Sequence, residues 1–548
     1  MNTAWIEEYP RPQLKRNSFY SLNGEWLLNH YPIIVPFAPE SQLSLYHHTI
    51  QNQLHYQKTF VLPDHFYTDQ DCVILHFGAV DQIATVYLNG QMIGQHVGGY
   101  LPFSFQITDA LVAGENHLVV DVIDKLSHVY PYGKQRKDRG GMWYTPISGI
   151  WQSVWIEAVP DNSIQDIKIK PTLSTIDLDV TTQALHYSVI IPELEFKQTY
   201  QQKHIHIDLS SYELQLWDVN NPHLYTFYIE TDTDRVESYF ALRTIEIKKV
   251  NQYERIYLNH KPLFLHGVLD QGYYHDGIYL PHNPLEYQKD VLRMKELGMN
   301  VLRKHIKIEP ETFYYACDRL GMLVIQDMVN NGSYHWFFDT ALPNAGFLYR
   351  PDYFAGNKKQ RDFFQNHMLE TLDHLYNHPC IIAYTIFNEG WGQFKADQMY
   401  RLCRKKDDTR LYDATSGWFH QHESDFESLH VYFKNKCLKS HQQRPLFLSE
   451  CGGYTRAIEG HIFNQEKQYG YGSTNSEKAL TDKIIQLYEE MVIPSINYGL
   501  CGCIYTQLSD VEDEINGLYT YDREICKVDK IKMKILAQWI QGMIKDVE

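Results

Sequence analysis

Two glutamates, each at the end of a short apolar run, are the residues best suited to chemistry in this chain. Glu389 follows Ile386-Phe387-Asn388 and Glu450 follows Leu446-Phe447-Leu448-Ser449, with a glycine close behind each. An apolar run that stops at a carboxylate is typical of a barrel strand whose last side chain enters a polar pocket. Enzymatic cleavage of a glycosidic bond typically requires two carboxyl groups that face one pocket.

The elements that must position these glutamates follow residue 255, where apolar strands and amphipathic helices alternate. The strand candidates are 263–266, 300–303, 322–325, 380–387, 411–415, 427–432, 445–449 and 499–506. Helical patterns lie between most of them, and this order predicts a (β/α)₈ barrel. Glu389 and Glu450 end the fourth and seventh strands. Because parallel strands of a barrel end on one face, their side chains are expected to converge.

A glycosidase would give these two carboxyl groups different roles. Glu389 would be the acid/base that protonates the leaving oxygen and then activates water, while Glu450 would attack the anomeric carbon. Retention of configuration would follow, and Asn388 would hydrogen-bond the 2-hydroxyl of the sugar. The alternative is structural, because an Asn-Glu pair after a strand can also cap a helix.

The first half of the chain reads as β structure. Residues 15–160 show short alternating runs, and Asn89-Gly90 between two such runs predicts a type I′ hairpin. Residues 161–250 have the length and strand spacing of a second, smaller β-sandwich.

Composition limits the classes of partner. The net charge of −17 disfavours nucleic acid and anionic membranes as main partners. The N-terminus lacks a basic region followed by an apolar stretch, and no run reaches a membrane-spanning length. The 9 Cys lack metal-ligand spacing and read as reduced thiols. We therefore expect a cytoplasmic protein with a neutral substrate.

Several motifs, taken in order, resemble those of glycoside hydrolase family 2, the family of β-galactosidases, β-glucuronidases and β-mannosidases. Phe387-Asn388-Glu389-Gly390-Trp391-Gly392 resembles its acid/base segment, and Ser449-Glu450 its nucleophile segment. Ser148-Gly149-Ile150-Trp151-Gln152-Ser153-Val154 resembles the end of its jelly-roll domain. Phe240-Ala241-Leu242-Arg243 resembles the junction that leads into its barrel.

The resemblance implies a multidomain β plus α/β fold. Its parts would be an N-terminal jelly-roll β-sandwich of the sugar-binding type over 1–160, an immunoglobulin-like β-sandwich over 161–252, and a C-terminal (β/α)₈ TIM barrel over 253–548. Whether the jelly-roll, through 139–143, reaches the active site is left open by the sequence. The family also implies a dimer or tetramer.

The resemblance also implies roles for further residues. Tyr432 would contact the nucleophile and Arg303 would lie beneath it, so that both keep Glu450 ionised. Residue type and position, without the resemblance, suggest further candidates for sugar contacts: an aromatic platform of Trp391, Trp418 and Tyr505, and polar residues at or just after strand ends, Asp270, His305, Lys307 and Asp327. Each of these could instead belong to the core.

The glycone is the least determined part of the prediction. In the family's β-glucuronidases an Asn-x-Lys element late in the barrel binds the sugar carboxylate, and the comparable stretch 514–519 has no lysine. A buried carboxylate needs a cation, so the sequence favours a β-galactosidase. The alternative is a β-glucuronidase or β-galacturonidase that uses Lys307 or Arg523. The alternative from another class is a non-catalytic carbohydrate-binding protein.

No metal or cofactor is expected. Where the large β-galactosidases have a metal-binding segment after the third strand, this chain has Asp327-Met328-Val329-Asn330-Asn331-Gly332, which does not match.

Overall fold

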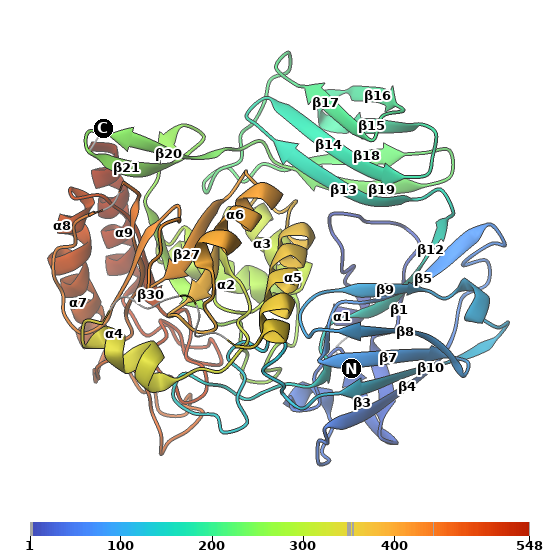
Figure 1. Cartoon of the computed structure of the whole chain (residues 1–548), viewed down its shortest axis with the longest axis horizontal. Coiled ribbons are helices and arrows are strands. Elements are labelled where there is room, and N and C mark those ends of the chain that lie inside the picture. The colour runs from blue at the N-terminus through green and yellow to red at the C-terminus, as the bar shows by residue number, and fades with distance from the viewer. Residues whose placement is uncertain (1–3, 348–351, 353–355, 442, 547–548) are drawn as a thin grey trace.

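The structure is a computed structural model that describes residues 4–347, 352, 356–441 and 443–546. Two β-sandwiches lie beside a barrel that is surrounded by helices (Figure 1). The predicted fold class, a sugar-binding-type sandwich, a second sandwich and a parallel barrel, is confirmed. The domain boundaries remain predictions.

The N-terminal sandwich consists of a four-stranded and a six-stranded antiparallel sheet around one apolar core. The first sheet orders β1 (Tyr20–Ser21), β12 (Val154–Pro160), β5 (Asp71–Phe77) and β9 (Phe103–Gln106). The second orders β3 (Tyr31–Val35), β2 (Gly24–Leu28), β4 (Gln53–Val61), β10 (Glu115–Ile123), β7 (Ile83–Leu88) and β8 (Gln91–Val97). The short strands β6 (Val80–Asp81) and β11 (Gly149–Ile150) pair separately.

The predicted hairpin joins β7 and β8. Leu88 pairs with Gln91, and the two residues between them have positive φ, 51° at Asn89 and 81° at Gly90. A type I′ turn requires this conformation at both positions, which Asn-Gly tolerates best. The hairpin prediction is confirmed.

The second sandwich has a separate core. One sheet orders β13 (Ile164–Pro171), β14 (Thr175–Thr182) and β17 (His204–Asp208), and the other β16 (Phe196–Tyr200), β15 (Tyr187–Ile191), β18 (Tyr225–Glu230) and β19 (Arg235–Phe240). A three-stranded sheet follows, of β20 (Ile245–Val250), β21 (Tyr253–Leu258) and β22 (Lys261–Pro262). Arg255 ties it to the barrel by donating to the carbonyls of Ile496 and Leu500. The predicted boundary at 252/253 falls in the turn between β20 and β21.

Eight parallel strands form the barrel, in the order β27 (Leu411–Ser416), β26 (Ile381–Asn388), β25 (Leu323–Asp327), β24 (Val301–Lys304), β23 (Leu265–Asp270), β30 (Leu500–Thr506), β29 (Leu446–Gly452) and β28 (Glu427–Val431). Most of their residues are buried, as the continuous apolar runs require of strands covered on both faces. The seam between β27 and β28 carries a contact between the hydroxyls of Ser416 and Ser428, 3.3 Å apart. The eight predicted strands are all present.

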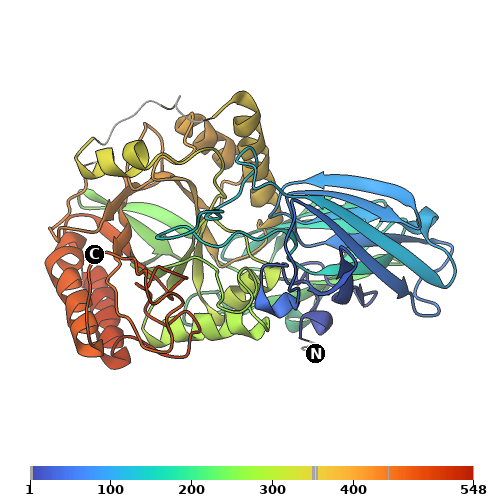
Figure 2. The ribbon, with the colours of Figure 1, turned by 90° about the horizontal axis from the view of Figure 1, so that it is seen from below.

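Helices cover the outside of the barrel (Figures 1 and 2). They are α2 (Leu285–Glu296), α3 (Glu311–Leu320), α5 (Lys358–His374), α6 (Ala396–Lys406), α7 (Glu477–Leu487), α8 (Ile493–Ile496) and α9 (Lys530–Asp546), with short helices α1 (Ala4–Glu7) and α4 (Leu342–Asn344) elsewhere. The alternation is not complete, because the described residues between β27 and β29 form no helix. None of the described helices is long and apolar enough to cross a membrane.

One long connection of the N-terminal sandwich, residues 124–148, crosses to the barrel (Figure 2). The amides of Tyr132 and Gly133 donate to the carbonyl of Asn330, and the hydroxyl of Tyr144 donates to Glu514. Trp143 and Tyr144 belong to the same apolar cluster as the barrel strands. The question left open by the sequence is thereby answered, since this segment lies on the face where the strands end.

Candidate active site

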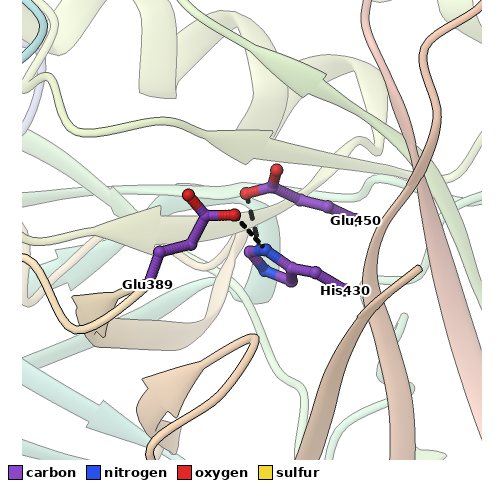
Figure 3. A group of neighbouring side chains, drawn as sticks. All are labelled: Glu389, His430 and Glu450. Atoms are coloured by element: carbon purple, nitrogen blue, oxygen red, sulfur yellow. Dashed lines mark hydrogen bonds and ion pairs between the residues drawn. The ribbon is translucent and has the colours of Figure 1, made fainter. Parts of the chain in front are cut away.

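The two predicted carboxylates converge at that face. Glu389 directly follows β26 and Glu450 lies in β29, and one oxygen of each lies within 4.8 Å of the other (Figure 3). Retaining glycosidases hold their carboxyl groups about 5–5.5 Å apart, whereas inverting ones need about 6.5–9.5 Å to admit a water molecule. The separation therefore fits a double displacement.

His430, which sequence reasoning did not select, lies between the two carboxylates (Figure 3). Its Nδ1 is 2.8 Å from Oε1 of Glu389, and its Nε2 is 3.6 Å from Oε1 of Glu450 and 3.0 Å from the hydroxyl of Ser416. A ring that contacts both carboxylates fixes their relative position. The sequence does contain a signal for His430. It precedes Tyr432 by two residues, and side chains two residues apart along a strand point to the same face of the sheet.

Arg303 lies beneath the pair, as predicted, and is fully buried. Its guanidinium donates to Oε1 of Glu450 at 3.1 Å, to the Asn388 side-chain oxygen at 2.9 Å and to Asp327 at 3.0 Å. Because Arg303 occupies the oxygen of Asn388, the amide NH₂ of Asn388 is the group left to meet a substrate hydroxyl. The Arg303 guanidinium thus orients both Glu450 and Asn388.

The surroundings of Glu450 keep it ionised. Burial alone would raise the pKa of Glu450, but the charges of His430 and Arg303 and the hydrogen bond from the Tyr432 hydroxyl lower it to about 2. Tyr432 is held in place by stacking on Tyr471, with ring centroids 4.1 Å apart. The arrangement provides a carboxylate ready to act as a nucleophile at neutral pH.

The polar candidates at the strand ends are mostly engaged with protein partners. Both oxygens of Asp327 accept hydrogen bonds, from Arg303 and from His305. Asp270 pairs with Lys304 at 2.6 Å and also accepts from the amide of Gly272. His305 uses Nδ1 for Asp327, which leaves Nε2 for a ligand. A sugar contact by each of these residues remains a prediction.

The aromatic platform does not assemble as expected. Trp418 lines the pocket that contains Glu389, and its ring lies edge-on to His430 at 5.5 Å. Trp391 and Tyr505 do not line this pocket; both are buried, and the Tyr505 hydroxyl accepts from the amide of Tyr454. Aromatic residues serve cores and pockets alike, so residue type alone could not separate the two roles.

The pocket has a volume of about 550 Å³ and is strongly aromatic. The segment from the N-terminal sandwich contributes Arg136 and Trp143, and the Trp143 ring meets those of Tyr334 and Trp391 at 5.1 Å each. Its mouth carries the exposed rings of Trp336 and Phe433. A leaving group would therefore meet flat apolar surfaces on several sides.

The two cations considered for a uronic acid are occupied. The ammonium of Lys307 pairs with Glu309 at 2.9 Å and also donates to the carbonyls of Gly272 and Tyr279. Arg523 pairs with Asp290 at 3.3 Å and donates to the carbonyl of Tyr521. Both cations have protein partners in the described structure, and a carboxylate contact by either of them stays a prediction.

Glu389, His430 and Glu450 also lie close enough together to share a divalent cation, since one donor atom from each falls within 4.8 Å of the others. The donor set is of a kind that zinc accepts. The prediction that no metal is required stays a prediction.

The fold and the site together define a protein with a β-sandwich of the sugar-binding type and a barrel that holds two carboxylates at its strand ends. The description "Glycosyl hydrolases family 2, sugar binding domain" matches residues 19–160, and "Glycosyl hydrolases family 2, TIM barrel domain" matches residues 246–526. The second match alone spans more than half of the chain. The chain therefore belongs to glycoside hydrolase family 2, as the motifs indicated.

Individual relatives are distant. A protein of Formosa agariphila is 27% identical over 340 residues, which are 58% of this chain and 37% of that protein. A β-galactosidase of Thermoanaerobacter pseudethanolicus is 23% identical over 378 residues, 61% of this chain and 47% of the relative. The chain thus spans less than half the length of these relatives. The solved structure of a β-D-glucuronidase from Dictyoglomus thermophilum is 18% identical, covers 98% of both chains and superposes with a TM-score of 0.75, which shows the shared fold.

Proposed function

We propose that the protein is a retaining exo-β-glycosidase that removes a terminal β-linked sugar by double displacement. The observation that carries the proposal is the carboxylate pair, with oxygens within 4.8 Å and Glu450 held ionised by His430 and Arg303. A non-catalytic carbohydrate-binding protein would have no need for two such carboxylates joined by one histidine.

In the first step Glu450 attacks the anomeric carbon while Glu389 protonates the departing oxygen. A covalent glycosyl ester on Glu450 results, and the leaving group departs through the aromatic pocket. In the second step Glu389 takes a proton from water, which attacks the same carbon and releases the sugar with its original configuration. The NH₂ group of Asn388 meets the 2-hydroxyl, and the buried Arg303 keeps Asn388 and Glu450 in register.

The glycone is either a uronic acid or a neutral hexose. Relatives carry both names, a β-galactosidase in Thermoanaerobacter pseudethanolicus at 23% identity and a β-glucuronidase in Streptococcus agalactiae at 24% over 369 residues. We propose a β-glucuronide as the substrate, ahead of the β-galactoside that the sequence favoured. The sequence argument against a uronic acid was only that no cation was available to bind its carboxylate. Lys134 of the N-terminal sandwich is a candidate for this cation.

Aryl β-glycosides test the proposal directly. The wild-type protein should release nitrophenol from at least one sugar of a panel of glucuronide, galacturonide, glucoside and galactoside. Glu450→Gln should abolish this turnover, and Glu389→Gln should reduce it strongly. Near-wild-type turnover in either variant would show that the roles are wrongly assigned.

A further inference from the structure

Lys134 is a mostly buried lysine whose ammonium has neither a hydrogen-bond nor an ion-pair partner within the described residues. It lies on the segment that crosses from the N-terminal sandwich, and the residue as a whole is 9% exposed. Every other buried lysine or arginine that the structure describes donates to a carboxylate or a backbone carbonyl: Arg16, Arg243, Arg255, Arg303, Lys304, Lys307, Arg410, Arg523 and Lys527. Lys134 is the exception.

The backbone around Lys134 is firmly held. The amide of Gly133 donates to the carbonyl of Asn330, and the carbonyl of Lys134 accepts from the amide of Tyr144 at 3.0 Å. The side chain of Gln135 bonds to Asp81, Tyr100 and the amide of Ile147. The backbone of Lys134 is therefore held in one position, as a binding residue requires.

The ammonium lies beside a ring that lines the aromatic pocket. It is 5.5 Å from the centroid of the Trp143 ring, which lines the pocket. Burial raises the pKa of Glu514, and the charge of Lys134 opposes that rise. Burial lowers the pKa of His305, and Lys134 adds to the lowering. The charge of Glu450 also acts on both of these groups, so His305 and Glu514 each lie within electrostatic range of Lys134 and of the nucleophile candidate.

The Lys134 ammonium is not among the fully buried polar atoms that lack a partner in the described structure, so it keeps contact with water and can exchange that water for an anion. Glu514 does not neutralise it by direct pairing, since the Glu514 carboxylate accepts from the Tyr144 hydroxyl and from Asn516 and forms no ion pair with Lys134 in the described structure. An anionic group of the substrate could form that pair. A sugar carboxylate is the anion that a glycone can bring to this depth.

We propose that Lys134, supplied by the N-terminal sugar-binding domain, is the residue that recognises the carboxylate of a uronic acid glycone. This inference rests on the proposed glycosidase function. The stretch 514–519 contributes Glu514 instead of a lysine, so the cation and the acid come from two domains and lie within electrostatic range of each other. In a uronic acid the carboxylate and the 4-hydroxyl are neighbours, and Lys134 would take the first while Glu514 accepts from the second.

The test compares paired substrates that differ only at C6, nitrophenyl β-D-glucuronide with the glucoside and β-D-galacturonide with the galactoside. Lys134→Met keeps the length of the side chain and removes the charge. Lys137→Met removes an exposed lysine three positions along the same segment and serves as the matched control. Thermal unfolding of each variant establishes that it is folded.

We expect Lys134→Met to lower kcat/KM on the uronide about 10²–10³-fold, the range for truncating a buried charge pair, with little change on the neutral partner. Lys134→Arg should retain part of the uronide activity, and Lys137→Met all of it. The inference is overturned if the wild-type protein prefers the neutral sugar, or if Lys134→Met lowers both substrates of a pair equally.

A binding measurement separates this inference from the proposed function. Free D-glucuronate should raise the unfolding temperature of the wild-type protein more than D-glucose does, and Lys134→Met should remove the difference. If no aryl glycoside is hydrolysed but this difference is present, the glycosidase proposal fails while the carboxylate site stands. Equal shifts of the unfolding temperature with both sugars would contradict the inference about Lys134.

Discussion

The hydroxyl of Tyr432 offers a quantitative test of how the site keeps its nucleophile ionised. It donates to Oε2 of Glu450, and a hydrogen bond to a charged group contributes about 1.5–3 kcal/mol. One pKa unit corresponds to about 1.36 kcal/mol, so Tyr432→Phe should raise the pKa of Glu450 by about one to two units. From about 2 in the wild type, the pKa would rise to about 3–4, towards but below the ordinary value of a glutamate. A higher pKa means that Glu450 is protonated, and inactive, at a higher pH.

The assay is the pH dependence of kcat/KM on the best aryl glycoside, whose acidic limb reports the essential base of the free enzyme. Tyr432→Phe should move this limb to higher pH. The free energy of unfolding should depend on pH in the same direction. A carboxylate whose pKa is depressed in the folded state stabilises the fold at pH values above its unfolded-state pKa, and this contribution is lost as the pH falls towards its folded-state pKa. Tyr384→Phe is the control, since that buried hydroxyl has no hydrogen-bond partner in the described structure. An unchanged acidic limb in Tyr432→Phe would refute the reasoning.

Three further predictions concern the carboxylate pair. Glu389→Ala should slow hydrolysis of glycosides with poor leaving groups about 10²–10⁴-fold. The first step with dinitrophenyl glycosides should be slowed much less, because dinitrophenolate leaves without a proton. Equal losses on both kinds of substrate would contradict the acid role of Glu389. His430→Asn should lower kcat more than KM, because the ring holds both carboxylates in position; a change in KM alone would contradict it. Zn²⁺ should inhibit the wild-type protein reversibly by binding Glu389, His430 and Glu450, with activity restored by a chelator, and inhibition should be weaker in His430→Asn. Loss of activity in the chelator itself would contradict the expectation that no metal is required.

The barrel and its carboxylates could be predicted from the sequence because their signals are local. A buried strand shows itself as a continuous apolar run, and Glu389 and Glu450 interrupt such runs at the point where a barrel strand ends. The hairpin at Asn89-Gly90 is equally local, since two residues decide the turn. The sequence shows no helical pattern between the fifth and seventh strands, and the described residues between β27 and β29 indeed form no helix.

The rest of the site could not be predicted because it depends on contacts between distant parts of the chain. Lys134 lies between Gly133 and Gln135 in a loop, and nothing around it in the sequence indicates that its charge acts on Glu514 of the barrel. Lys307 and Arg523 looked available only because Glu309 and Asp290, which neutralise them, could not be assigned as partners from one sequence. Trp391 and Tyr505 show the same limit, since burial in a core and exposure in a pocket use the same residue types.

The identity of the residue that becomes covalently attached to the sugar tests the central claim most directly. A 2-deoxy-2-fluoro form of the best aryl glycoside, with a dinitrophenol leaving group, should trap the intermediate, because fluorine at C2 destabilises the oxocarbenium-like transition state of its hydrolysis. Mass spectrometry of the digested protein should then find the fluorosugar on the peptide that carries Glu450, at one label per chain. A label on Glu389, or none on a protein that hydrolyses the parent glycoside, would contradict the account.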